Sequence, residues 1–242
     1  MIPSIKLTYV DKEGVAEPIR LALVLAGIDF EDIRVNCPDW KELKPKTPYG
    51  QLPIMEINDN GEYKAHSGAM LRYCGQLNTD DNTESSFLYP NEKMFEIEEA
   101  IGLITDLNNA FTPSLYISVR PQVFGYPEGS QATDEGKART EALRTTFWKE
   151  ILPTFLDHIE ALLSKSGNKW LVSGCDKPTI ADCFAVPNLR RFTCGHIDFI
   201  PSNCLETHPK VVQYLERFCA LPEIQGRYTD GIGSVMAKAE EE

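Results

Sequence analysis

Two residues place a hydroxyl group at the end of a predicted structural element. Tyr9 lies at the end of a β-like run, and a phenol with an ordinary pKa near ~10 stays protonated, so it would be a hydrogen-bond donor and not a base. Ser67 opens a helix-like stretch, whose first amides lack partners and whose dipole favours an anion. Both residue types suit the stabilisation of negative charge. A tyrosine packed at a strand end and a simple N-cap serine are the structural alternatives.

A proline raises a question about a second strand end. Residues 49–57 read YGQLPIMEI, so Pro53 occupies the first position of an apolar, strand-like run. Proline donates no backbone hydrogen bond and is confined to strand starts, edges and bulges. The end of this strand is therefore expected to be unusual.

Composition narrows the possible partners. The net charge of −12 opposes binding to nucleic acid or to anionic membranes, so only a local positive site would hold an anion. No window approaches the ~20 apolar residues of a membrane span, and the N-terminus lacks the features of a signal peptide, so we expect a cytoplasmic protein. The seven cysteines are scattered without a CxxC pair, which favours buried free thiols over a disulfide framework or a metal site.

The first part of the chain predicts a small mixed α/β domain. Its expected order is β-α-β-α-β-β-α, with β-like runs at 5–10, 30–35, 54–57 and 62–65. Pro18 and Gly27 bracket the first helix, and Ser67 is expected to cap the last one. The polar residues 78–86 predict a linker, with domains at 1–80 and 87–242 and the linker itself at 81–86.

The second part predicts an all-helical domain. Helices are expected at 91–110, 136–165 with a kink at Pro153, 179–192 and 208–220, with a loop or broken helix over 112–129. Thr179 and Asp182 have the spacing of a capping box, and Pro178 and Cys183 are placed for a hydrophobic staple.

Short motifs carry a resemblance to a known family. KLTY (6–9), WKELK (40–44), GQLP (50–53) and HSGA (66–69) stand in the order found in the cytosolic glutathione transferases, and PTIADCF (178–184) and HPKV (208–211) resemble later motifs of that family. The resemblance covers nearly the full length. It implies a thioredoxin-like α/β domain followed by an all-α domain, and Tyr9 looks most like that of the tyrosine-type, sigma-class members.

The resemblance implies that Tyr9 is the catalytic residue, which donates a hydrogen bond to the thiolate of glutathione. A thiol with a pKa of about 8.5 is only a few per cent ionised at pH 7, and lowering it by ~2 units corresponds to about 2.7 kcal/mol. One hydrogen bond to a charged group contributes about 1.5–3 kcal/mol. A single hydroxyl group is therefore nearly sufficient.

The resemblance also implies which residues hold glutathione. The glycyl carboxylate is assigned to Trp40 and Lys44, the cysteinyl backbone to Leu52 before a cis-Pro53, and the γ-glutamyl end to Gln51, His66, Ser67 and, across a dimer interface, Asp106. His66 stands where relatives usually have glutamine or glutamate. A solvated lysine and a solvent-facing aspartate are the alternatives for Lys44 and Asp106. Glutathione is expected as a co-substrate, with no tightly bound cofactor and no metal.

Near Tyr9 the chain departs from its relatives. The stretch DKEGV lacks the arginine that supports the thiolate in sigma-like members, and Val10 replaces a common phenylalanine. We therefore expect weaker thiol activation and a different electrophile site. Two roles are open for a set of apolar residues: they line an apolar pocket at the domain boundary, or they only pack in the protein interior. These residues are Val10, Phe111, Tyr116, Phe124 and Tyr126.

Three functions remain open from the sequence. The first is conjugation of glutathione to small apolar electrophiles, together with peroxidase activity; the second is a glutathione-dependent isomerase of the prostaglandin D synthase type. The third is a non-catalytic structural relative such as a lens crystallin, which has no physical reason to keep all the ligand contacts. A homodimer is expected, in which Tyr49 either inserts into the partner subunit or only packs its own turn.

Overall fold

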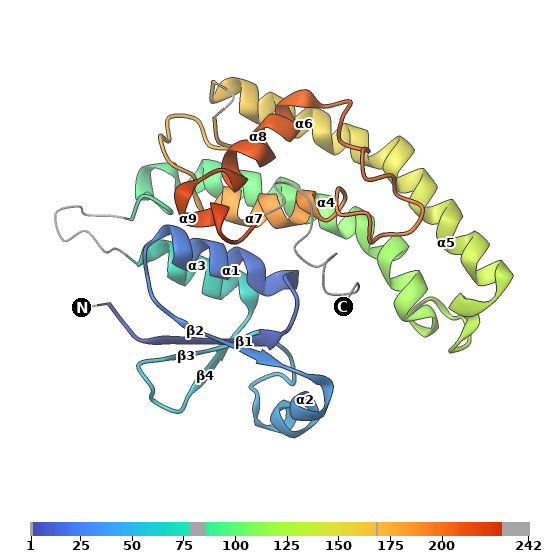
Figure 1. Ribbon diagram of the computed structural model, residues 1–242, viewed down its shortest axis with the longest axis horizontal. Helices are drawn as coiled ribbons and strands as arrows, with labels where there is room; N and C mark the ends of the chain where they lie inside the picture. Colours follow the sequence, from blue (N-terminus) through green and yellow to red (C-terminus); the bar gives the residue numbers. More distant parts are fainter. Residues whose placement is uncertain (1, 78–85, 168, 229–242) are drawn as a thin grey trace.

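The computed structural model describes residues 2–77, 86–167 and 169–228, and it consists of an α/β domain followed by a helical domain (Figure 1). The elements of the first domain are β1 (Ile5–Val10), α1 (Glu17–Leu25), β2 (Glu31–Val35), α2 (Cys37–Leu43), β3 (Ile54–Ile57), β4 (Tyr63–Ala65) and α3 (Ser67–Gln76). This order confirms the predicted succession of strands and helices. The predicted linker falls almost wholly on residues 78–85, which lie outside the described residues, so the domain boundaries stay a prediction.

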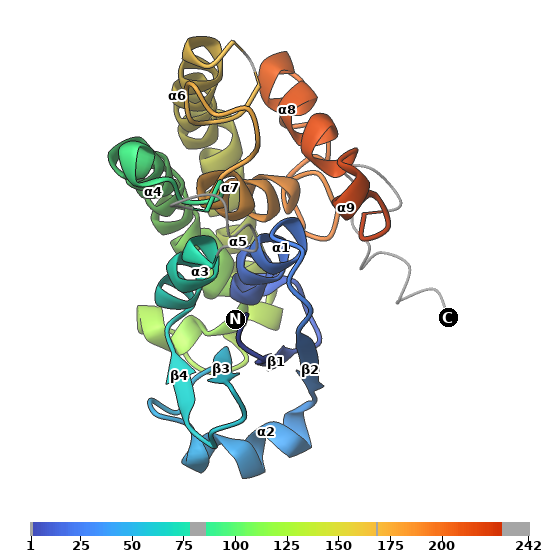
Figure 2. The same cartoon turned by 90° about the vertical axis from the view of Figure 1, so that its left-hand side faces the viewer.

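The strands form a mixed sheet in the order β2-β1-β3-β4. Strand β1 is parallel to β2 and antiparallel to β3, and β3 is antiparallel to β4. Leu7 in the central strand pairs with Met55, and both side chains are buried. Figure 2 shows α1 and α3 between the sheet and the C-terminal helices, with α2 on the other side of the sheet. This arrangement is the expected thioredoxin-like fold.

The second domain is helical throughout its described part. Its helices are α4 (Met94–Val119), α5 (Asp134–Thr146), α6 (Leu152–Lys165), α7 (Ile180–Arg190), α8 (Pro209–Cys219) and α9 (Pro222–Gln225). Helix α7 is central, because it contacts α1 and α3 of the first domain as well as α4 and α8. Figure 1 shows α4 and α5 projecting beyond the α/β domain. None of the described helices is long and apolar enough to cross a membrane.

The predicted capping box at the start of α7 is confirmed. Thr179 is the N-cap; its hydroxyl accepts from the amide of Ala181, and its own amide donates to Asp182 at 2.7 Å. The buried Asp182 also accepts hydrogen bonds from the Leu171 amide and the Tyr214 hydroxyl, both at 3.0 Å. A fully paired carboxylate therefore sets where this buried helix begins.

The prediction of a loop or broken helix over 112–129 is wrong in its first half. Helix α4 continues through Pro113 to Val119, because Phe111, Ser114 and Ile117 are buried against the bundle and this packing outweighs the lost hydrogen bond. The predicted helix 136–165 is interrupted by a π-helical turn at Phe147–Ile151, next to the expected kink at Pro153.

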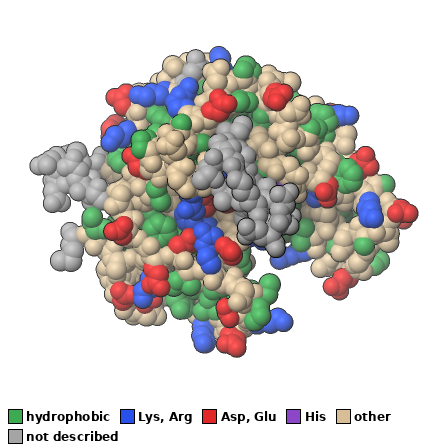
Figure 3. All heavy atoms as spheres, in the orientation of Figure 1, with side chains coloured by type: hydrophobic (Ala, Val, Ile, Leu, Met, Phe, Trp, Pro, Cys, Tyr) green, Lys and Arg blue, Asp and Glu red, His purple; other side chains and the backbone are tan. Residues whose placement is uncertain are grey.

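A buried carboxylate joins the two domains. Glu17 at the start of α1 is 0% exposed and accepts hydrogen bonds from Arg227 (2.7 Å), Tyr228 (2.7 Å) and Arg20 (3.3 Å). Figure 3 shows acidic and basic side chains gathered where the domains meet on this face. Although burial opposes ionisation, the hydrogen bonds and charges of Arg227, Tyr228 and Arg20 hold the pKa of Glu17 below its usual range.

We expect Glu17→Gln to lower the free energy of unfolding by about 3 kcal/mol at pH 7, because it breaks a buried ion pair. The folded-state pKa lies below the unfolded value of about 4.3, so the stabilisation by Glu17 is complete above pH ~5 and is lost as the pH falls through the folded-state pKa. Urea unfolding at several pH values measures this effect. Glu62→Gln, which removes an exposed ion pair with Lys64, is the control and should change stability by less than ~0.5 kcal/mol. A difference between wild type and Glu17→Gln that does not shrink in acid would contradict the assignment.

Candidate functional site

A cavity of about 180 Å³ lies at the ends of several elements of the first domain. It is lined by Val15, Tyr49, Gln51, Leu52, Pro53, Ala65, His66 and Ser67. The structure thus brings together the predicted ligand residues of the GQLP and HSGA motifs. Ligand pockets usually measure ~300–1,000 Å³, so this cavity encloses only part of a ligand the size of a tripeptide.

The chain just before β3 has the unusual backbone that Pro53 indicated. The Leu52–Pro53 peptide bond is cis, and β3 begins at the following residue. Neither the amide nor the carbonyl of Leu52 has a hydrogen-bond partner among the residues that the structure describes. Both groups border the cavity and are free to pair with an extended backbone.

The prediction that Ser67 caps α3 is wrong by one residue. The N-cap is His66, whose φ of 70° turns the chain from β4 into the helix, and Ser67 is the first helical residue. The hydroxyl of Ser67 has no partner within the described part of the chain, and it lies on the cavity together with the start of α3. An anion in the cavity would therefore meet a hydroxyl donor and the positive end of a helix dipole.

The ring of His66 packs against Tyr49, with centroids 5.0 Å apart. Both residues line the cavity, and Tyr49 is 64% exposed to solvent. The sequence alone did not indicate this contact, because Tyr49 and His66 belong to separate loops.

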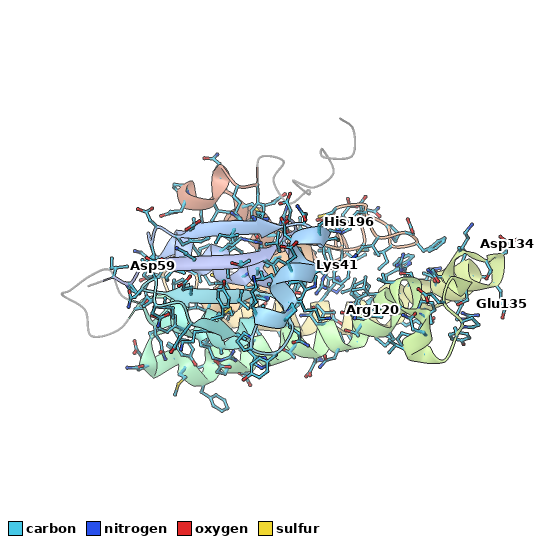
Figure 4. All side chains as sticks on the ribbon, turned by 90° about the horizontal axis from the view of Figure 1, so that it is seen from below. Lys41, Asp59, Arg120, Asp134, Glu135 and His196 are labelled. Atoms are coloured by element: carbon cyan, nitrogen blue, oxygen red, sulfur yellow. The ribbon has the colours of Figure 1, made fainter. Side chains whose placement is uncertain are left out.

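Two predicted glutathione-binding residues, Trp40 in α2 and Lys44 directly after it, do not line the cavity. Lys44 follows α2, and its side chain runs 3.5 Å from where a Cβ of Gly50 would stand. Trp40 is partly buried one turn earlier. Figure 4, seen from below, labels Lys41 of the same helix, which lies on the side of the sheet away from the helical domain (Figure 2). Asp106 is exposed on α4 and is not among the residues that line the cavity.

Tyr9 is the penultimate residue of β1 and is partly buried, with the guanidinium of Arg20 5.8 Å from its ring centroid. Gly14 lies against its hydroxyl group: a Cβ at Gly14 would stand 2.5 Å from the Tyr9 oxygen. The next residue, Val15, lines the cavity. Tyr9 itself is not among the residues that line the cavity, but Gly14 connects it to them, because Gly14 lies against its hydroxyl and precedes Val15 in the chain.

The apolar residues suggested for an electrophile pocket divide into two groups. Phe111 is 1% exposed and packs on Phe147 and Phe192, so a pocket-lining role for it is wrong. Its ring belongs to the helical core because one face of α4 is buried there. Tyr116, Phe124 and Tyr126 are 37–39% exposed on α4 and the segment that follows, and with the partly buried Val10 they remain candidates.

The cysteines are free, as expected, although only three of the seven are buried. Burial raises the pKa of Cys74 to about 12, so this thiol is not a nucleophile at neutral pH. The described residues contain no group of His, Cys, Asp and Glu side chains that would hold a metal ion.

Family models match both halves of the chain: the N-terminal domain of glutathione S-transferases at residues 5–76 and their C-terminal domain at residues 128–227. Glutathione S-transferase 1 of Ascaris suum is 32% identical over 224 residues, which cover 93% of this chain and 95% of that protein. The chain belongs to the glutathione S-transferase family. The cavity therefore lies in the N-terminal domain of a glutathione S-transferase fold.

Two solved structures share this transferase fold. A monomeric glutathione S-transferase from the hookworm Necator americanus superposes with a TM-score of 0.68 at 23% identity, covering 94% of this chain and 96% of its own. Prostaglandin synthase D of Nilaparvata lugens has a TM-score of 0.68 at 22% identity, covering 94% of this chain and 98% of its own. At these identities the likeness shows the fold alone.

Sequence reasoning missed Gly14 as a neighbour of the catalytic candidate. It noted only that DKEGV lacks an arginine, although a glycine in a polar loop beside a functional tyrosine is a signal of close backbone approach. With a φ of 47°, Gly14 also adopts a conformation that other residues rarely take.

We expect Gly14→Ala to lower kcat by ten-fold or more, because the new methyl group would displace the Tyr9 hydroxyl. The KM for glutathione should change little. Steady-state kinetics with an aryl halide measure both. Gly27→Ala is a matched control, because Gly27 also has a positive φ (65°) but no atom within 4 Å of the added Cβ. Equal losses in the two variants would mean that strain, and not contact with Tyr9, is responsible.

Proposed function

We propose that this transferase binds glutathione in the cavity, ionises its thiol at Tyr9 and transfers the thiolate to small apolar electrophiles in the cytoplasm. The observation that carries the proposal is the juxtaposition of the unpaired Leu52 backbone with the free Ser67 hydroxyl at the start of α3. The Leu52 backbone offers strand-like pairing to a peptide, and the Ser67 hydroxyl with the start of α3 offers a site for the carboxylate of that peptide.

The glutathione pose follows from the size and chemistry of the site. The γ-glutamyl end occupies the cavity of about 180 Å³, where its carboxylate meets Ser67 and its chain passes Gln51 and His66. The cysteinyl backbone pairs with Leu52. The glycyl carboxylate then points out of the cavity toward Lys44 beside Gly50, and toward Trp40. These groups supply the local positive site that an overall charge of −12 makes necessary.

Tyr9 stabilises the thiolate by donating its hydroxyl proton in a hydrogen bond and keeping it. The sulfur attacks the electrophilic carbon and the leaving group departs with the bonding electron pair. A sigma-type class assignment is consistent with the KLTY motif around Tyr9. The partly exposed Val10 at the end of the same strand and the apolar Tyr116 of α4 are the first candidates for contact with the electrophile.

Two variants should affect different kinetic constants. We expect Tyr9→Phe to lower kcat by ten-fold or more with the KM for glutathione nearly unchanged, because only the hydrogen bond to the thiolate is lost. Lys44→Ala should raise the KM for glutathione several-fold with kcat nearly unchanged, because it removes a contact made before and during reaction. Initial rates with a generic aryl halide measure both. Unchanged turnover in Tyr9→Phe would refute its catalytic role.

An isomerase of the prostaglandin D synthase type is the second candidate, because a prostaglandin synthase D shares the fold over 94% of this chain. Assaying a prostaglandin endoperoxide beside the aryl halide separates the two reactions. An organic hydroperoxide in the same series tests the peroxidase activity. A protein that neither binds glutathione resin nor turns over any of these substrates would be a non-catalytic relative.

A homodimer is part of the proposal, and exposed apolar side chains support it. Tyr49, Met94 and Phe95 are 64%, 50% and 79% exposed, so an interface that covered them would remove apolar surface from water. Asp106 on α4 would then contact the glutathione of the partner subunit. The fold does not require pairing, since one structure with this fold is described as monomeric.

We expect Tyr49→Ala to weaken the dimer at least ten-fold, because aromatic anchors dominate interface energies. Analytical ultracentrifugation over a range of concentrations measures the dissociation constant. Phe124→Ala, which removes a 39% exposed aromatic residue in the segment after α4, is the control and should not change it. A wild-type protein that sediments as a monomer at all concentrations would contradict the dimer.

A further inference from the structure

Three arginines hold the loop between β1 and α1. Arg34 pairs with Asp11 at 3.2 Å at the exposed end of the loop. Arg20 of α1 donates to the backbone carbonyls of Lys12 (2.9 Å) and Glu13 (3.2 Å). Each of these two arginines belongs to the first domain. The third contact comes from the other domain.

Arg190 is the last residue of α7, and its guanidinium lies 3.1 and 3.2 Å from the two carboxylate oxygens of Glu13. The Arg190 side chain is 0% exposed, and the Glu13 side chain is 25% exposed. The guanidinium also stacks on the ring of Tyr228, 3.8 Å from its centroid. A buried ion pair with this geometry orients both partners.

The position of Glu13 gives this ion pair a connection to the candidate catalytic group. Glu13 immediately precedes Gly14, which lies against the Tyr9 hydroxyl, and Val15 lines the cavity. Arg190 is thus linked through one side chain and one peptide unit to the hydroxyl that would bind the thiolate. A carboxylate on this loop, without a counterion, would raise the pKa of a thiol bound at Tyr9 by repulsion of like charges.

We propose that Arg190 is a positioning residue for thiol activation, which acts through Glu13 to keep Gly14 against the Tyr9 hydroxyl and to neutralise the loop carboxylate. The inference rests on the proposed function, since it assumes that Tyr9 activates glutathione. It also accounts for the loop sequence. DKEGV carries no arginine of its own, and the other domain supplies a guanidinium at this point.

The test measures the pH midpoint at which glutathione ionises on the full-length protein, from the ultraviolet absorbance of its thiolate. We expect Arg190→Met to raise this midpoint by about one unit, which lowers kcat/KM about ten-fold below the midpoint. The KM for glutathione should stay within about two-fold. In a Glu13→Gln background the same substitution should shift the midpoint by less than about 0.3 units, because Arg190 acts through Glu13. Arg190→Gln replaces the methionine variant if the latter does not fold.

Arg72→Met is the matched control. It breaks another ion pair between the domains, from α3 to Glu98 of α4, and should leave the midpoint where it is. An unchanged midpoint in Arg190→Met, or an equal shift with and without the Glu13 carboxylate, would overturn the inference. Failure of the proposed function looks different, because then neither wild type nor Tyr9→Phe would lower the midpoint of glutathione at all.

Discussion

A carboxylate group that is buried at the domain boundary constrains much of this structure. Removing Glu17 from water costs several kcal/mol unless its charge is paired and its oxygens are hydrogen-bonded. The partners come from α1 itself, through Arg20, and from the C-terminal end of the described chain, through Arg227 and Tyr228. The start of α1 and the segment after α9 must therefore lie together, which brings the helical domain over the loop that follows β1.

That arrangement also holds the loop that follows Tyr9, the candidate catalytic residue. Arg20 contacts Glu17 with the same guanidinium nitrogen that holds the backbone of Lys12 and Glu13, and Tyr228 stacks on the guanidinium of Arg190. The loop beside the catalytic candidate is thus part of one charged network that spans both domains. A preorganised donor is more effective than a mobile one, because no reorganisation is needed when charge develops on the sulfur.

The ligand site uses backbone groups more than reactive side chains. Leu52 offers an amide and a carbonyl, His66 turns the chain so that α3 begins at the cavity, and Gly14 allows backbone to approach a hydroxyl. Such a site suits a peptide substrate, whose own backbone and carboxylates supply the complementary groups.

Local patterns in the sequence were sufficient where local forces decide the structure. The bounds of β1 agree at both ends and the capping box at Thr179 is present. The cis peptide bond before Pro53, which the family resemblance implied, is also confirmed. Local reasoning failed where burial overrides propensity. Proline at 113 indicated a break, yet α4 passes through it because its buried face is held by the bundle.

The sequence by itself predicted the order of the elements, because this depends on periodicity, caps and residues close together in the chain, and its motifs carried the resemblance to the family. Only the tertiary structure decided how the loop that follows Tyr9 is held. Glu13 and Arg190 are 177 positions apart, and nothing in either local pattern indicates the other. Their contact arises because a buried charge must find its counterion wherever the packing of the two domains places one.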